Sequence, residues 1–332
     1  MARADLLLSL VKAATGGDQP LVQKTVEAMI AEERSKHHTV LADQLDKLVH
    51  ANGNGNGHER KAEIATPRSG TGSELVQEIT PRRTLADIVL SGPIREAVDE
   101  LVQEHHRTDL LRSYNLRPRN RMLLTGPPGN GKTSLAEALA HALMVPFVVV
   151  RYDGLITSYL GETASRLRRL FEYAHTRRCL LFFDEFDTLG KERGDIHETG
   201  EIKRVVSSLL LQIDDLPSHV VVVSATNHPE LLDRAVWRRF QLRLELPYPT
   251  QAQISEYLEL ISQRLNFELG LSHKALAGKL NGASFSELED FISDVARKYV
   301  LALPGGEPKT IVASKLRQWK VRAPATGRKA GK

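Results

Sequence analysis

Cysteine is nearly absent from this chain. The 332 residues include a single cysteine, Cys179, which excludes an intramolecular disulfide and any metal site built from several cysteines. Cys179 opens an apolar run, so we expect a buried thiol rather than a redox centre. A histidine metal site is also disfavoured, because the pairs at 37–38 and 105–106 lack helix-spaced partners and are more typical of solvated faces.

Long hydrophobic runs are missing as well. No window reaches the roughly 20 uncharged apolar residues that cross a bilayer, and the N-terminus lacks a basic stretch followed by an apolar segment. We therefore expect a cytoplasmic protein with no membrane span. Its 41% apolar content is sufficient for a core, and its length fits about two domains.

An excess of charge of one sign is confined to the C-terminus. The chain has 45 basic and 41 acidic residues, a net charge of +4. Arg322, Arg328, Lys329 and Lys332 lie near the end with no acid among them, so the body of the chain is balanced. We expect residues 323–332 to be a disordered basic tail. A nucleic-acid-binding arm is the alternative, which the balanced body disfavours.

Composition divides the rest of the chain into four segments. Apolar residues at three- and four-residue spacings predict a three-helix bundle over residues 1–50, and the run NGNGNG indicates a flexible linker over 51–75. Residues 76–249 alternate β-rich runs with helical stretches, which predicts a parallel sheet covered on both faces. Residues 250–322 are helical. The predicted strands are MLLT (122–125), PFVVV (146–150), CLLFF (179–183), VVVVS (220–224) and LRLEL (242–246).

A glycine-rich loop, GPPGNGKTS, lies between the first of these strands and a helical stretch. Its glycines allow a tight turn whose N–H groups, with the helix N-terminus, cradle phosphate oxygens. Lys132 is expected to reach the β- and γ-phosphates of ATP, and Thr133 to ligate Mg²⁺. An ordinary glycine-rich turn is the alternative, which the flanking elements disfavour. The predicted nucleotide-binding residues are Gly126, Pro127, Pro128, Gly129, Asn130, Gly131, Lys132, Thr133 and Ser134.

An acidic pair follows the apolar run CLLFF. The run would deliver Asp184 and Glu185 to the carboxyl end of a buried strand, beside the phosphate-binding loop. Asp184 is predicted to hold Mg²⁺ through its water shell, and Glu185 to act as general base toward the attacking water. A helix cap or an acidic surface turn is the alternative reading.

The stretch SATNHPELLDRAVWRRF, residues 224–240, resembles the second region of homology of AAA family ATPases, in the narrower group that includes katanin and spastin. The resemblance implies a P-loop NTPase α/β core with Walker A and Walker B motifs and a small α-helical C-terminal lid. It makes Asn227 the sensor of the attacking water, and Arg238 and Arg239 paired arginine fingers that enter a neighbouring subunit's site. ATP hydrolysis would then require a homo-oligomeric ring, a hexamer. A solvated basic turn is the alternative for the two arginines.

Two further stretches extend this resemblance. TSYLGET resembles the first pore loop, in which Tyr159, Leu160 and Gly161 would grip a threaded polypeptide; a core tyrosine beside a turn is the alternative. GASFSELEDF resembles the segment that contacts base and ribose. Ser284 matches it, but the next two residues are phenylalanine and serine where glycine and alanine are usual.

The segment RTLADIVLSGPIREAVDELV resembles the stretch that flanks adenine, which makes Asp87 and Ile88 candidates for an adenine pocket. Taken together, the motifs predict an ATPase ring that remodels, unfolds or disassembles protein substrates threaded past pore-loop aromatics. The N-terminal bundle would choose the substrate or adaptor. Two alternatives remain: a nucleic-acid-associated ATPase such as a loader or transposition helper, and a nucleotide-switched scaffold.

Overall fold

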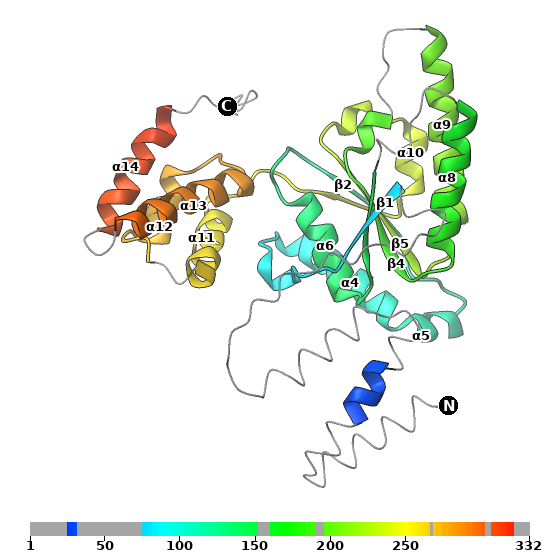
Figure 1. Cartoon of the computed structure of the whole chain (residues 1–332), viewed down its shortest axis with the longest axis horizontal. Coiled ribbons are helices and arrows are strands. Elements are labelled where there is room, and N and C mark those ends of the chain that lie inside the picture. The colour runs from blue at the N-terminus through cyan, green and yellow to red at the C-terminus, as the bar shows by residue number, and fades with distance from the viewer. Residues whose placement is uncertain are drawn as a thin grey trace.

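The computed structural model describes residues 25–31, 75–151, 160–189, 196–265, 268–302 and 307–321. Residues 25–31 are helical. The remainder of the predicted N-terminal bundle, the linker up to residue 74 and the basic tail lie outside the described residues, so these assignments stay predictions. Figure 1 shows two parts beyond residue 75, a sheet flanked by helices and an all-helical C-terminal part.

The sheet has six strands in the order β1-β3-β4-β5-β2-β6. The five predicted strands are confirmed, and they pair in parallel. The sixth, β1 (Val76–Ile79), was not predicted from the sequence; it pairs antiparallel with β3 at one edge. The sheet is therefore parallel except for this edge strand. The predicted strands are β2 (Arg121–Thr125), β3 (Phe147–Val150), β4 (Cys179–Phe183), β5 (Val220–Thr226) and β6 (Leu242–Glu245).

Helices cover both faces of the sheet, as the alternation of strands and helices predicted. Alternate residues of β4 point to opposite faces: Leu181 and Phe183 join one core cluster, whereas Leu180 and Phe182 join the other. Helices α8 (Leu160–His175), α9 (Ile196–Asp215) and α10 (Arg234–Arg239) cover the first face. Helices α4 (Gly92–His106) and α6 (Lys132–Ala142) cover the second.

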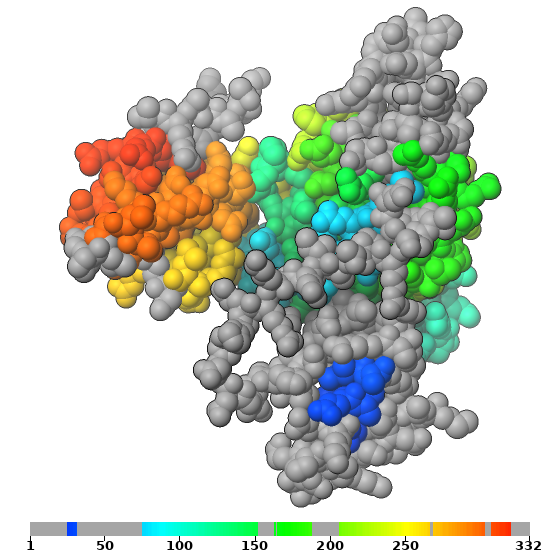
Figure 2. Space-filling model, viewed as in Figure 1, coloured from blue at the N-terminus to red at the C-terminus, as the bar shows by residue number. Residues whose placement is uncertain are grey.

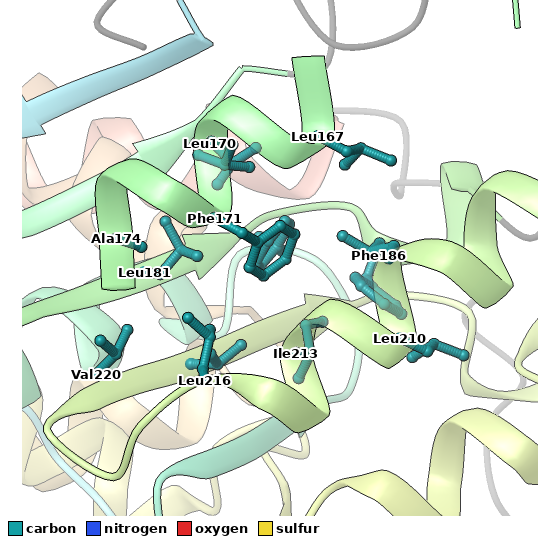
Figure 3. Packing of buried hydrophobic residues seen from close by; sticks show 14 of the residues in the cluster. Leu167, Leu170, Phe171, Ala174, Leu181, Phe186, Leu210, Ile213, Leu216 and Val220 are labelled. Atoms are coloured by element: carbon teal, nitrogen blue, oxygen red, sulfur yellow. The ribbon is translucent and has the colours of Figure 1, made fainter. Parts of the chain in front are cut away.

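Aromatic packing fixes the carboxyl end of β4. Figure 3 shows Phe171 of α8 and Ile213 of α9 within the same cluster as Phe186, which follows the acidic pair after this strand. The rings of Phe183 and Phe186 meet edge to face with centroids 6.1 Å apart. Because these two phenylalanines are buried on either side of residues 184 and 185, the acidic pair is held between two anchored positions.

Two expectations about single side chains have different outcomes. Cys179 is 1% exposed, and burial raises the pKa of its thiol to about 12, which confirms a buried structural cysteine. The solvated face expected for His105 is wrong. Its Nε2 lies 2.7 Å from the Arg119 carbonyl oxygen, and burial lowers its pKa. His106 is exposed, while His37 and His38 lie outside the described residues.

The C-terminal part is the predicted helical lid. Helices α11 (Gln251–Leu265), α12 (His273–Lys279), α13 (Phe285–Leu301) and α14 (Pro308–Val321) enclose their own apolar cluster, which includes Leu258, Leu288, Ile292 and Val312. The described residues after β6 contain no strand. Figure 2 shows the lid, coloured yellow to red, lying against the α/β part.

Shorter elements connect these layers. Helix α5 (Thr108–Ser113) follows α4, and single 3-10 turns occur at Leu85–Asp87, Phe186–Leu189 and Pro229–Leu231. No helix in the described part of the chain combines the length and apolar content that a bilayer crossing requires.

Candidate active site

A cavity of about 320 Å³ opens where the glycine-rich loop, the carboxyl ends of β4 and β5, and the lid converge. This volume lies within the range of about 300–1,000 Å³ typical of small-molecule sites. Twelve residues predicted from sequence line it: Asp87, Ile88, Pro128, Gly129, Asn130, Gly131, Lys132, Thr133, Ser134, Asp184, Glu185 and Asn227. The remaining lining residues are Arg83, Val89, Tyr257, Phe285, Ser286 and Glu289.

The loop glycines serve two different purposes. Gly126, Gly129 and Gly131 have φ of 131°, 77° and 84°, which side chains rarely tolerate. A Cβ at Gly126 would lie 2.2 Å from the Leu246 carbonyl oxygen, so this glycine permits close backbone packing. A Cβ at Gly131 would meet no atom within 4 Å, so there the backbone conformation alone requires glycine.

Lys132 is held by the loop that precedes it. Its Nζ donates to the carbonyl oxygens of Gly126 and Pro127 at 2.7 and 3.0 Å, and the residue is 7% exposed. Gly126 and Pro127 therefore position the lysine without lining the cavity. Burial lowers the pKa of Lys132, while the carboxylates of Asp184 and Asp187 oppose this shift.

Thr133 and Asp184 are brought together at the end of β4. The Thr133 hydroxyl donates to Asp184 Oδ2 at 3.0 Å, and the Glu185 N–H donates to Asp184 Oδ1 at 3.0 Å. A hydroxyl beside a carboxylate is the kind of hard oxygen set that suits Mg²⁺. Glu185 has a φ of 46°, an uncommon conformation for a non-glycine residue that often marks functional sites.

Sequence reasoning missed a buried carboxylate, Asp187, which the last residue of β5 contacts. The Thr226 hydroxyl donates to Asp187 Oδ1 at 2.8 Å, and Asp187 is only 4% exposed. The signal was present, because Asp187 follows the acidic pair in FDEFDTLG.

Next to Thr226, the Oδ1 atom of Asn227 is buried without a hydrogen-bond partner among the described residues. A donor arriving in the cavity would satisfy it.

Asn130 adds a second unsatisfied amide at the cavity. It is 2% exposed, and within the described part of the chain neither amide atom has a hydrogen-bond partner. Asn130 and Asn227 together fit a polar ligand better than an apolar one.

The opposite end of the cavity is formed mainly by the lid. The rings of Tyr257 and Phe285 meet edge to face with centroids 4.9 Å apart. The Ser286 N–H donates to the Gly129 carbonyl oxygen at 3.0 Å, which joins the lid to the glycine-rich loop. Glu289 accepts from Arg264 at 3.1 Å. Of these residues, the sequence drew attention only to Phe285 and Ser286, which stand where glycine and alanine are usual in the segment that contacts base and ribose.

Two predicted base-binding residues have structural roles here. Asp87 lines the cavity, but its Oδ2 accepts from the backbone N–H and the hydroxyl of Thr84, both at 2.7 Å. Ser284 does not line the cavity. It caps α13, where its hydroxyl accepts from the Glu287 N–H, and lies so close behind Gly129 that a Cβ there would be 2.9 Å from Ser284 Oγ.

The predicted arginine fingers lie away from the cavity, on α10. Arg239 pairs with Asp214 at 2.9 Å, and the same carboxylate pairs with Arg121. The Arg238 side chain is exposed, and no hydrogen bond or ion pair joins it to any other side chain that the structure describes. The pore-loop side chains of Tyr159, Leu160 and Gly161 lie outside the described residues; α8 begins at Leu160.

Comparisons with known proteins agree with this geometry. The profile of the ATPase family associated with various cellular activities (AAA) matches residues 122–248. The "Uncharacterized AAA family ATPase y4kL" of Sinorhizobium fredii is 37% identical over 302 residues, which cover 91% of this chain and 90% of that protein. This chain belongs to the AAA family of ATPases. Its glycine-rich loop is therefore the ATP-binding P-loop of an AAA ATPase.

Other relatives of this AAA ATPase share a smaller part of their length. The 26S proteasome regulatory subunit 8 homolog of Encephalitozoon cuniculi is 34% identical, over 59% of this chain and 51% of its own. The ATP-dependent zinc metalloprotease FtsH of Lancefieldella parvula is 30% identical, over 65% of this chain and 35% of its own. This AAA ATPase thus spans about half or less of these two relatives.

Proposed function

We propose that this AAA ATPase hydrolyses ATP as a homo-oligomeric ring, a hexamer, in which Arg238 of one subunit completes the site of the next. One observation carries the proposal: Lys132 and Arg83 are the only cations among the described residues that line the cavity. Phosphoryl transfer spreads negative charge over the γ-phosphate oxygens, which a single lysine neutralises only in part. Arg83 is tied to Ser134 of α6, so in this scheme the additional cation at the γ-phosphate is Arg238 of the neighbouring subunit.

Each residue at the phosphate end has a definite task in this scheme. Lys132 and the loop N–H groups bind the β- and γ-phosphates, and Glu185 accepts a proton from the attacking water. Asn227, whose Oδ1 is buried without a partner among the described residues, orients that water. Thr133 and Asp184 would hold Mg²⁺, which when bound offsets negative charge on the phosphate oxygens.

The two adjacent arginines are suited to different tasks. Arg239 is anchored within its own subunit by Asp214, and its Nη1 donates to the Ala235 carbonyl oxygen at 3.0 Å. Arg238 is exposed on the same short helix. Arg238 is therefore the better candidate for the arginine that enters the neighbouring site, and Arg239 for the residue that fixes α10.

Protein substrates are the proposed target of this ring. The support is the resemblance of residues 157–163 to a pore loop, and the names of two relatives, a proteasome regulatory subunit and an ATP-dependent protease. The katanin- and spastin-like features of residues 224–240 point the same way. Tyr159→Ala should abolish substrate unfolding if the chain threads proteins, whereas a scaffold would be unaffected. DNA-stimulated turnover that is lost in salt would instead favour a nucleic-acid role.

Mixing two inactive variants tests the shared site. Glu185→Gln subunits keep Arg238 but lack the base, while Arg238→Ala subunits keep the base but lack the finger. Each variant alone should hydrolyse ATP at about one thousandth of the wild-type rate or more slowly. A mixture should recover activity, because a Glu185→Gln subunit can supply Arg238 to an Arg238→Ala subunit whose base is intact. The readout is steady-state phosphate release.

A matched mixture provides the control. Glu185→Gln with Lys132→Ala should stay inactive, because Lys132 and Glu185 belong to the same subunit's cavity and no mixed interface unites them. Full activity of Arg238→Ala alone, or no recovery in mixed rings whose co-assembly is verified, would contradict action between subunits.

A further inference from the structure

Arg83 is tied at both ends to the helix that carries the P-loop lysine. Its Nη1 donates to the hydroxyl of Ser134 in α6. Its backbone N–H, like that of Arg82, donates to Glu137 Oε1 of the same helix, at 3.3 and 3.1 Å. The guanidinium therefore keeps a fixed place on the cavity wall.

The two cations of the cavity occupy different parts of it. Lys132 lies toward the end of β4, since the next residue, Thr133, donates to Asp184 at 3.0 Å. Arg83 lies toward the base end. The pKa of Asp87 is lowered first by its hydrogen bonds from Thr84 and further by the positive charge of Arg83.

The geometry points to Arg83 as a ligand of the α-phosphate, an inference that rests on ATP lying in the cavity as proposed above. With the β- and γ-phosphates at Lys132 and the base toward Tyr257 and Phe285, the α-phosphate falls between them. Ser134 follows the Thr133 hydroxyl directly in α6, and the guanidinium bonded to Ser134 is the cation in that interval. A guanidinium has five N–H donors, so it can bond Ser134 and a phosphate oxygen together.

This role differs from that of an arginine finger. The α-phosphate is present in both ATP and ADP and keeps its charge during hydrolysis. An interaction made equally in the ground and transition states alters binding without altering the chemical step. Arg83→Ala should therefore raise KM and the Kd of ADP about tenfold or more, with kcat nearly unchanged.

Sulfur substitution in ADP locates the contact. Calorimetry on the 332-residue chain would compare wild type and Arg83→Ala with ADP, the two diastereomers of ADPαS, and ADPβS. Sulfur accepts hydrogen bonds poorly, so in one ADPαS diastereomer the contact is already weakened and the substitution should cost less than with ADP. With ADPβS the loss should equal that with ADP, because distant changes add independently.

Arg82→Ala is the matched control, since the neighbouring arginine is exposed and shares only the backbone bond to Glu137. It should leave all four affinities unchanged. If Arg83→Ala lowers the melting temperature, Arg83→Lys keeps the charge and the stem and undergoes the same sulfur comparison.

Three results would overturn the assignment: an unchanged Kd for ADP in Arg83→Ala, a reduced loss with ADPβS instead of ADPαS, or an equal loss with all four nucleotides. The first result would mean that Arg83 does not contact ADP, and the second that it contacts the β-phosphate. The third would mean that it contacts no phosphate. Failure of the wild-type chain to bind ADP at all would refute nucleotide binding itself, which is a distinguishable outcome.

Discussion

The two ends of the cavity are built in different ways. At the phosphate end, Asp184 and Asn227 directly follow β4 and β5, and Lys132 ends the loop that follows the neighbouring strand β2. At the base end, Arg83 comes from the connection between β1 and α4, while Tyr257 and Phe285 come from two helices of the lid. The sheet holds the first set rigidly, whereas the second set depends on how the lid meets the P-loop.

The largest expected effect comes from breaking the phosphate end. Lys132→Met removes the buried ammonium while keeping the stem, and should weaken ATP and ADP binding by about 100-fold or more, the upper range for a hydrogen bond to a charged group. Nucleotide titration checks this. Unchanged melting of the ligand-free protein would show that the loss is local, and retained ATP affinity would refute the assignment of Lys132.

Weakening the base end should have a smaller effect. Phe285→Ala removes one ring of the aromatic pair with Tyr257 and should reduce ADP affinity about tenfold, in line with the contribution of one aromatic contact to a base. ADP and GDP should lose affinity alike, because every base can stack on a ring, and titration with each nucleotide measures both values. Tyr248→Ala, an exposed aromatic outside the cavity, should change neither value.

The smallest effect is expected outside both ends. Asp214→Asn removes the charge that joins Arg121 to Arg239 and should lower the free energy of unfolding by about 1 kcal/mol, because the pair is partly exposed. ADP affinity should be unchanged. Chemical denaturation checks the stability, with Asp109→Asn in the exposed pair with Arg112 as a control that should change little. A tenfold loss of ADP affinity in Asp214→Asn would contradict the separation of α10 from the cavity.

The phosphate end could be predicted from the sequence because its parts are continuous motifs attached to strongly apolar strands. GPPGNGKTS and the acidic pair each follow such a strand, so their neighbours in space are fixed by the sheet. Asp187 was missed even there, because burial and its bond from Thr226 arise only when β4 and β5 lie side by side.

The base end could not be predicted in the same way. Tyr257 and Phe285 are ordinary amphipathic-helix residues in the sequence, and only the folding of α11 against α13 brings their rings together. Ser284 matched a nucleotide-binding pattern but caps a helix behind Gly129. Strand β1 escaped prediction because its four residues, VQEI, include two polar ones and gain their order from pairing with β3.

The hydrogen bond from Ser286 to Gly129 has a mechanical consequence. At 3.0 Å it tolerates only a few tenths of an ångström before it weakens, so a displaced P-loop must either break it or carry the first turn of α13 along. This helix has 17 residues and is about 25 Å long, so a small tilt at its start is magnified at its far tip. The first turn of α13 thus couples the position of the P-loop to the orientation of the lid, in the manner of a lever.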